Sequence, residues 1–222
     1  MITDRVARTF EIEIPGHEGL RLMGITPRKR PPRESVMRCY REELAEAHRI
    51  IEPRAVYATC PGGLPGSQAI PARAPHALAV CTIGKQLEKR TRWLIDQGDS
   101  ARAMILDAIG SAAVEEVADR VNGELCDRYV AEGQLPGLRS SPGYGKWLVS
   151  EQPLIFDLLQ PAETGVALNA SHVMTPTKSI SFALPLQGGD LVRGPRGRCA
   201  RCGMKSCAYR VIPRGERSGE SG

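Results

Sequence analysis

The longest helical pattern in the chain covers residues 100–132 and constrains the fold more than any other segment. Its apolar residues recur every three or four positions, which places them on one face of an α-helix. Asp99 or Ser100 stands where a capping side chain is expected. The apolar stripe comprises Met104, Ile105, Ala108, Ile109, Ala112, Ala113, Val117, Val121 and Leu125. Such a helix has to bury this face against another layer of structure.

Two features interrupt the stripe. The segment GSAA, which begins at Gly110, carries little side-chain bulk, so another element can approach the helix closely there. Glu115 and Glu116 place two carboxylates in an otherwise apolar pattern, and we expect one of them to face inwards or to lie at the margin of the stripe.

Strand patterns occur on both sides of this helix. Residues 5–14 alternate, with Phe10, Ile12 and Ile14 on one side, and HALAVCTIG is an apolar run typical of a buried strand. After the helix, two strands are expected to be joined by the turn MTPTK, the second with one buried face that comprises Ile180, Phe182, Leu184 and Leu186. A further strand is expected in EPRAVYAT, further helices at 34–51, 85–96 and 154–159, and either a strand or a helical turn at 19–25.

These elements lack the strict alternation of strand and helix that a parallel sheet requires. The sequence therefore predicts an α+β fold, with a mostly antiparallel twisted sheet and helices packed on it. We divide the 222 residues into an N-terminal strand region with a basic linker (1–33), an α+β domain (34–187), and a cysteine-containing tail rich in glycine and arginine (188–222). The composition of the tail's last residues, GERSGESG, predicts disorder.

The net charge of +5 lies largely at the basic linker and the tail, and aromatic residues make up only 5% of the chain. Few stacking platforms for bases are then available, which argues against nucleic acid as a partner. No segment has the roughly 20 apolar residues of a membrane span, and the N-terminus has no secretory pattern. The chain is therefore predicted to be cytoplasmic, with its seven cysteines reduced.

The loop LRSSPGYGKWLVS after the long helix carries the residues best suited to a ligand. Arg139 can fix a carboxylate through two parallel hydrogen bonds. Pro142 and Gly143 expose backbone groups, since glycine has no side chain to block approach. Tyr144 offers a flat ring and a hydroxyl. On spacing alone, a surface turn with a structural tyrosine explains the same residues.

At this loop the chain resembles the activation domain of cobalamin-dependent methionine synthase, which carries an R-x-x-P-G-Y signature that RSSPGY matches. VEEVAD resembles the helix in which the family places a ligand-contacting glutamate, here Glu115. The stretch ETGVALNASHVMTPTKSIS also matches the family pattern, at Thr164, Gly165, Leu168, Asn169, Ser171, Met174, Pro176, Ser179 and Ser181. The resemblance covers roughly residues 75–186. The chain is more similar to small stand-alone relatives of the domain than to the full-length enzyme.

The resemblance implies a module that binds S-adenosylmethionine and supports the reductive methylation of cobalamin carried by a separate methyltransferase or corrinoid protein. Arg139 would hold the methionine carboxylate, Gly143 would offer backbone contacts, Tyr144 would pack on the ligand, and Glu115 would accept from the ammonium. A flavodoxin or ferredoxin electron donor is a further hypothesis.

Several family features are missing from the sequence. The loop lacks the C-P-x-H segment and retains only an acidic residue, Glu151; a family tyrosine is replaced around residues 182–184; and the early ligand-binding aspartate has no counterpart in residues 1–75. The substrate barrels and the D-x-H-x-x-G cobalamin motif are also absent. The chain is therefore at most a component or accessory of methionine synthase, and a docking module for a corrinoid protein without nucleotide binding is the alternative.

The tail has a separate motif, Cys199-x2-Cys202-x4-Cys207, whose first pair has the spacing of thiolates that share a metal. Neighbouring arginines and Lys205 favour the thiolate form. An iron–sulfur cluster or zinc fits three cysteines with a fourth ligand from Cys60, Cys81 or His172. The alternatives are a reduced tail with spare thiols, or an iron–sulfur or zinc protein that works through this motif alone.

Overall fold

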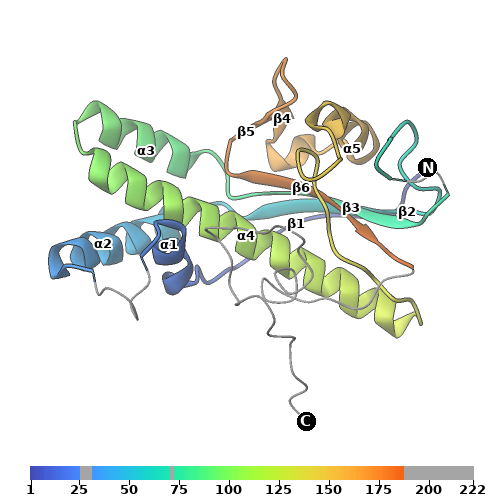
Figure 1. Ribbon diagram of the computed structural model, residues 1–222, viewed down its shortest axis with the longest axis horizontal. Coiled ribbons are helices and arrows are strands. Elements are labelled where there is room, and N and C mark those ends of the chain that lie inside the picture. Colours follow the sequence, from blue (N-terminus) through green and yellow to red (C-terminus); the bar gives the residue numbers. More distant parts are fainter. Residues whose placement is uncertain (26–31, 71–72, 188–222) are drawn as a thin grey trace, which may run out of the picture.

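The computed structural model describes residues 1–25, 32–70 and 73–187. Its centre is a four-stranded antiparallel sheet in the order β1-β2-β3-β6 (Figure 1). The strands are β1 (Thr3–Thr9), β2 (Arg54–Cys60), β3 (His76–Thr82) and β6 (Ser179–Pro185). The predicted α+β class with an antiparallel sheet is confirmed.

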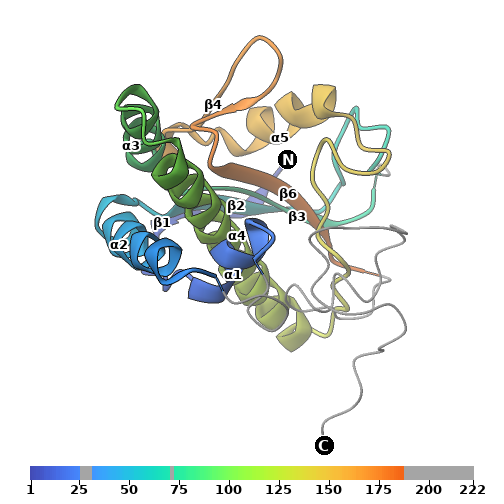
Figure 2. The same ribbon diagram turned by 60° about the vertical axis from the view of Figure 1, so that its left-hand side comes forward.

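Helices cover both faces of this sheet, as the two views in Figures 1 and 2 show. On one face, α4 (Ser100–Ala131) packs on β2, β3 and β6, and α1 (Gly16–Leu22), α2 (Glu34–Ile50) and α3 (Gln86–Asp96) pack against α4 and share its core. The other face packs against the loop that follows α4, the 3₁₀ helix η1 (Val149–Glu151), α5 (Gln152–Leu159) and η2 (Ala162–Thr164). The small pair β4 (Ala167–Leu168) and β5 (Met174–Thr175) completes the chain before β6.

Strand β3 is buried along its whole length, as its apolar sequence predicts. Because successive side chains of a strand point to opposite faces, Ala79 and Cys81 join the core beneath α4, whereas Leu78 and Val80 join the core beneath α5. The sheet is thus the middle layer of three.

Helix α4 is the longest element, at 32 residues, or about 48 Å at the α-helical rise. Asp99 caps it by accepting a hydrogen bond from the Arg102 backbone N–H at 3.1 Å. The predicted stripe is buried except for Met104, which is 61% exposed. Met104 lies in the first turns of α4, which pack beside α2 and α3 rather than on the sheet (Figure 1).

The N-terminal strand differs from its predicted bounds. Strand β1 ends at Thr9, which pairs with Arg54, the first residue of β2. The next residue of the partner is Pro53, which has no N–H to continue the ladder, although its carbonyl still accepts from the Phe10 N–H at 3.0 Å. Phe10 and Ile14 remain buried, so the apolar alternation is real although the strand is shorter. The ambiguous segment after it forms the end of α1.

The two strands that flank the MTPTK turn do not pair with each other, so the prediction of a strand pair joined by a tight turn is wrong. Met174 and Thr175, which belong to the expected turn, form β5 and pair with β4, whereas β6 pairs with β3. The second face of β6 is buried too, because Ser181 and Ala183 face the core beneath α5. The alternating pattern of β6 correctly predicted one buried face. It did not predict burial of the other face, because the residues there are small.

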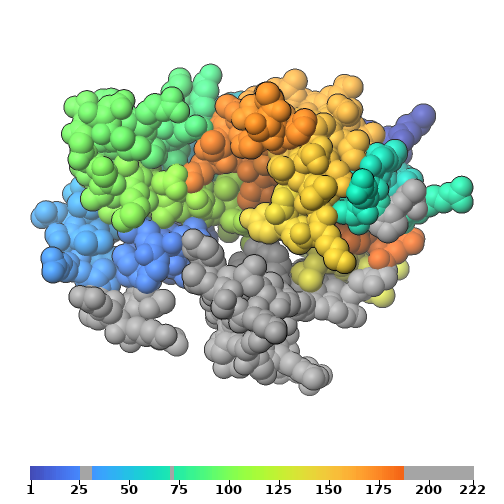
Figure 3. Space-filling model, turned by 45° about the horizontal axis from the view of Figure 1, so that its top comes forward, coloured from blue at the N-terminus to red at the C-terminus, as the bar shows by residue number. Residues whose placement is uncertain are grey.

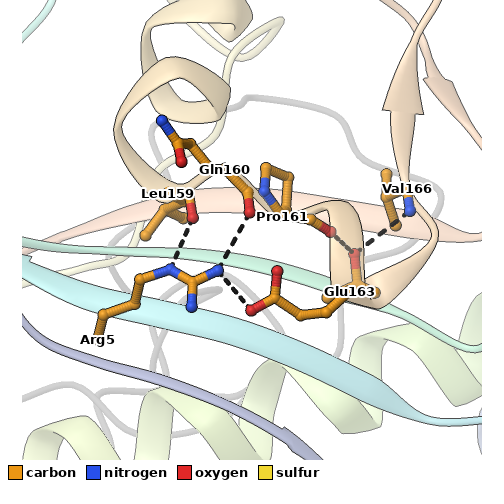
Figure 4. Close-up of polar contacts among 7 residues, drawn as sticks. Arg5, Leu159, Gln160, Pro161, Glu163 and Val166 are labelled. Atoms are coloured by element: carbon orange, nitrogen blue, oxygen red, sulfur yellow. Dashed lines mark hydrogen bonds and ion pairs between the residues drawn. The ribbon is translucent and has the colours of Figure 1, made fainter.

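Arg5 on the edge strand β1 forms hydrogen bonds to the C-terminal end of α5 and so links this helix to the sheet (Figure 4). Its Nε donates to the Leu159 carbonyl at 2.8 Å, and its Nη2 donates to the Gln160 carbonyl at 3.1 Å and to the Glu163 carboxylate at 2.5 Å. These carbonyls lie at the C-terminal end of α5, where backbone acceptors have no partner within the helix. A cation at that end also interacts favourably with the helix dipole.

Within the residues described by the structure, no helix is both long and apolar enough to cross a membrane.

Gly110 and Gly123 provide a matched test of the packing of α4. A Cβ on Gly110 would lie 2.6 Å from Cδ2 of Leu87, which is fully buried, whereas a Cβ on Gly123 meets no atom within 4 Å. We expect Gly123→Ala to raise the free energy of unfolding by about 0.5–1 kcal/mol through helix propensity. Gly110→Ala should lower it by about 1 kcal/mol or more through overpacking. Denaturant unfolding measures both changes, and equal stabilisation by the two substitutions would contradict this account.

Candidate functional site

The residues that carry Arg139 form an extra backbone ladder along β6. Ser140 and Ala183 exchange two hydrogen bonds, with the Ser140 N–H donating at 2.9 Å and the Ala183 N–H donating at 2.8 Å. The Gly137 N–H also donates to the Pro185 carbonyl at 2.9 Å. The sequence before the Pro-Gly turn is thus fixed to the sheet by its backbone, which leaves the Arg139 side chain to be directed toward α4.

Arg139 meets two carboxylates of α4. Its Nη2 donates to Oε2 of Glu115 at 2.7 Å and to Oδ1 of Asp119 at 3.0 Å. Residues four apart on a helix lie on the same face, so one stretch of α4 presents both acids. The guanidinium also lies 5.1 Å from the centre of the Phe182 ring. Only 7% of the Arg139 side chain is exposed.

The structure therefore brings together Glu115 and Arg139, which the sequence placed 24 positions apart. Asp119 was missed by the sequence analysis. A signal for it was available, since Asp119 follows Glu115 by one helical turn and belongs to the same VEEVAD segment.

The Pro-Gly-Tyr turn is held by its own backbone. The Gly143 N–H donates to the Trp147 carbonyl at 2.7 Å, and Gly143 adopts a φ of +91° that favours glycine. This N–H is therefore used inside the turn. Pro142 and Trp147 are buried and anchor the turn, whereas Tyr144 is 75% exposed.

Most of the other motif residues have structural tasks. Ser179 donates to the Pro176 carbonyl at 2.7 Å, Ser181 donates to Gln152 at 3.1 Å, and Thr164 donates to the Pro161 carbonyl at 2.6 Å. Asn169 accepts two backbone N–H bonds within the β4–β5 turn. Glu151 is buried and accepts from Ser67 at 2.5 Å, so it fixes the loop after β2.

A second cation lies on the same face of α4. Lys178, in the turn before β6, contacts Asp107 at 2.7 Å and Ser111 at 2.9 Å. Asp107, Ser111, Glu115 and Asp119 follow one another every four residues, so they form one polar row along the helix. Figure 3 shows the yellow loop after α4 and the orange β4–β5 segment on one face of the molecule. Gln152, the first residue of α5, links α5 to the β4–β5 segment by donating to the His172 carbonyl at 2.8 Å.

Cys81 lies below this cluster in β3. It is fully buried, and burial raises the pKa of its thiol to about 12, with Glu115 adding to the rise and Arg139 opposing it. The thiol is therefore neutral at physiological pH and serves the site as a small apolar side chain.

The predicted metal ligands Cys199, Cys202 and Cys207 lie outside the described residues. Within the described ranges, no group of three or more His, Cys, Asp or Glu side chains could hold a metal ion. Two of the three suggested fourth ligands, Cys60 and Cys81, are fully buried, each in one of the two cores.

An antiparallel four-stranded sheet, one long helix across it and an arginine loop laid along β6 make up the fold around this site. A solved structure of the MetH reactivation domain bound to AdoHcy superposes on the chain with a TM-score of 0.62. The match covers 84% of this chain and 80% of the solved one, at 13% sequence identity. Neither a protein-family model nor a curated protein matches this sequence. The predicted resemblance is thus confirmed at the level of the fold.

The burial of the cysteines predicts their order of reactivity. In the folded protein at pH 8, we expect iodoacetamide to modify Cys39, which is partly exposed, and to leave Cys60, Cys81 and Cys126 unmodified. The thiolate is the reactive form, and it is absent from Cys81 at this pH. Mass spectrometry of tryptic peptides measures the modification, and unfolding in guanidinium should make all four thiols reactive. Modification of native Cys81 at the rate of Cys39 would contradict the buried position.

Proposed function

We propose that this chain binds S-adenosylmethionine between the Arg139 loop and α4, and that it serves the reactivation of a separate corrinoid methyltransferase. The observation that carries the proposal is the presence of a buried arginine and an exposed tyrosine in one loop that is held to β6 by its backbone. Tyr144 is 75% exposed, and Arg139 is 7% exposed with a buried Nε that has no partner among the described residues. The solved domain with the same fold has AdoHcy bound.

The chain's own residues fit the methionine end of such a ligand. A carboxylate prefers two parallel N–H donors of a guanidinium, and Arg139 offers Nε and Nη2. The Glu115 side chain is 47% exposed and is the acceptor for the ammonium. Tyr144 packs its ring on the ligand, and the Gly143 carbonyl is within the same turn. The backbone of Arg139 is held by the ladder along β6, that of Tyr144 by the turn and that of Glu115 by α4, so the protein can act by positioning the ligand.

The bound ligand would supply the methyl group that traps the reduced cobalt of the partner's cobalamin. The protein's contribution is to hold the donor and to present it to that partner. Large apolar side chains are exposed on the two segments beside the site: Tyr144, Leu148, Val149 and Val173. A corrinoid protein that docks over the site would cover these side chains. An electron donor of the flavodoxin or ferredoxin class belongs to the same hypothesis.

Calorimetric titration with S-adenosylmethionine tests the proposal. We expect binding by the wild-type chain and a loss of about 10–100-fold in affinity for Arg139→Ala, since a charged hydrogen-bond pair is worth about 1.5–3 kcal/mol. Arg120→Ala is the matched control, because Arg120 lies on α4 and pairs with Glu116 rather than with the loop. It should bind like the wild type.

Absence of binding by the wild type, or equal binding by Arg139→Ala, would refute nucleotide binding. If the protein then still captured a purified corrinoid methyltransferase, the docking-module alternative would replace the proposal.

A metal or iron–sulfur cluster at Cys199, Cys202 and Cys207 is a second proposal, supported by the spacing of these residues alone. We expect anaerobically purified protein to contain about one zinc ion or one cluster per chain, as three clustered thiolates imply. Double substitution of Cys199 and Cys202 by serine should remove it, whereas Cys39→Ser should retain it. Metal analysis and a visible spectrum measure this. A colourless, metal-free sample would end the proposal and leave S-adenosylmethionine binding untouched.

A further inference from the structure

The Arg139 guanidinium has an uneven distribution of partners. Both carboxylates of α4 accept from the same nitrogen, Nη2, at 2.7 Å for Glu115 and 3.0 Å for Asp119. The neighbouring Nε is buried and has no hydrogen-bond partner within the described part of the chain. A carboxylate that binds a guanidinium through two parallel bonds needs two adjacent N–H groups, and Nε with Nη2 is such a pair.

Because Nε is closed to solvent here, a ligand carboxylate can complete this fork only if the side chains around the guanidinium move and one of the two acids gives up its bond to Nη2. The two acids differ in their freedom to do so. The Glu115 side chain is 47% exposed and has one more rotatable bond than aspartate, whereas the Asp119 side chain is 19% exposed. Glu115 can therefore turn toward solvent at a lower cost in burial, and Asp119 is the acid that stays.

We propose that Asp119 is a positioning residue of this site, which holds the Arg139 guanidinium in place while the carboxylate of the ligand replaces Glu115 on Nη2. The inference deepens the proposed function and rests on it. Glu115, once displaced, is adjacent to the methionine end of the ligand and can accept from its ammonium. One helical turn thus separates a permanent partner of the arginine from an exchangeable one.

The alternative is that Asp119 only competes with the ligand for Arg139. The two ideas predict opposite changes in the affinity for the ligand when Asp119 is removed. A competitor, once removed, leaves the arginine more available, and affinity rises. A positioning residue, once removed, leaves a long side chain to sample other rotamers, and affinity falls because that freedom has to be lost again on binding.

Calorimetric titration of the full chain with S-adenosylmethionine distinguishes them. We expect Asp119→Asn to bind about tenfold more weakly, in the range of one charge-assisted contact, and Asp119→Glu to recover most of the wild-type affinity. Glu116→Gln is the matched control, because it removes a carboxylate from the same helical turn that pairs with Arg120 and not with Arg139. It should leave the affinity unchanged. Circular dichroism establishes that each variant is folded.

The same titration with 5′-methylthioadenosine separates positioning from structural damage. This probe has the adenosine part of the ligand and no amino-acid part, so it cannot contact Arg139. We expect Asp119→Asn to bind 5′-methylthioadenosine with the same affinity as the wild type. If Asp119→Asn lost affinity equally for 5′-methylthioadenosine and S-adenosylmethionine, Asp119 would have a structural role and the inference would be overturned. Equal or tighter binding of S-adenosylmethionine by Asp119→Asn would overturn it in favour of competition. Failure of the wild type to bind S-adenosylmethionine would instead overturn the proposed function, and this inference with it.

Discussion

The close packing of α4 against the sheet is the contact on which the rest of the structure depends. The helix crosses the face formed by β3 and β6, and its buried side is rich in alanine, with Gly110 where Leu87 of α3 approaches. Small side chains let a helix lie close to its neighbours. That proximity brings the polar row of α4 within hydrogen-bond reach of two cations from elsewhere in the chain, Arg139 and Lys178. A bulkier stripe would move the acids away from both.

The position of Arg139 depends on backbone hydrogen bonds between its own segment and β6, which no sequence pattern predicts. Residues 137–140 lie along β6 through three backbone hydrogen bonds, although most of the segment is too irregular to count as a strand. Backbone groups carry the contact, so any sequence that can be extended would satisfy it. This explains why the loop after α4 gave no strand pattern and yet is as well fixed as one.

The sequence predicted those elements whose burial repeats with a clear period. Strand β3 and helix α4 are such cases, and both occupy nearly their expected ranges. The pairing of the segment before MTPTK with β6 was predicted wrongly, because a turn between two apolar segments does not show which strand each segment pairs with. The same limit applies to the site. The proximity of Glu115 and Arg139 was expected only because of the family resemblance. The hydrogen bond between Asp119 and Arg139 was found only in the structure.

The motif residues are of two kinds: those whose hydrogen bonds stabilise the fold, and those that the fold alone does not explain. Thr164, Asn169, Ser179 and Ser181 each bond to a neighbouring backbone or buried side chain, so the fold alone is a sufficient reason for them. A match at those positions supports the fold, in agreement with a TM-score of 0.62 at 13% identity.

Tyr144 and Arg139 are of the other kind. The tyrosine ring is exposed and contributes little to the core, and the arginine is buried with its Nε unpaired among residues 1–25, 32–70 and 73–187. Burying a cation whose hydrogen bonds are incomplete costs stability, and a protein selected for stability alone has better residues for both positions. Arg139 and Tyr144, rather than the longer stretch of matching serines and threonines, are therefore the reason to expect a ligand at this loop.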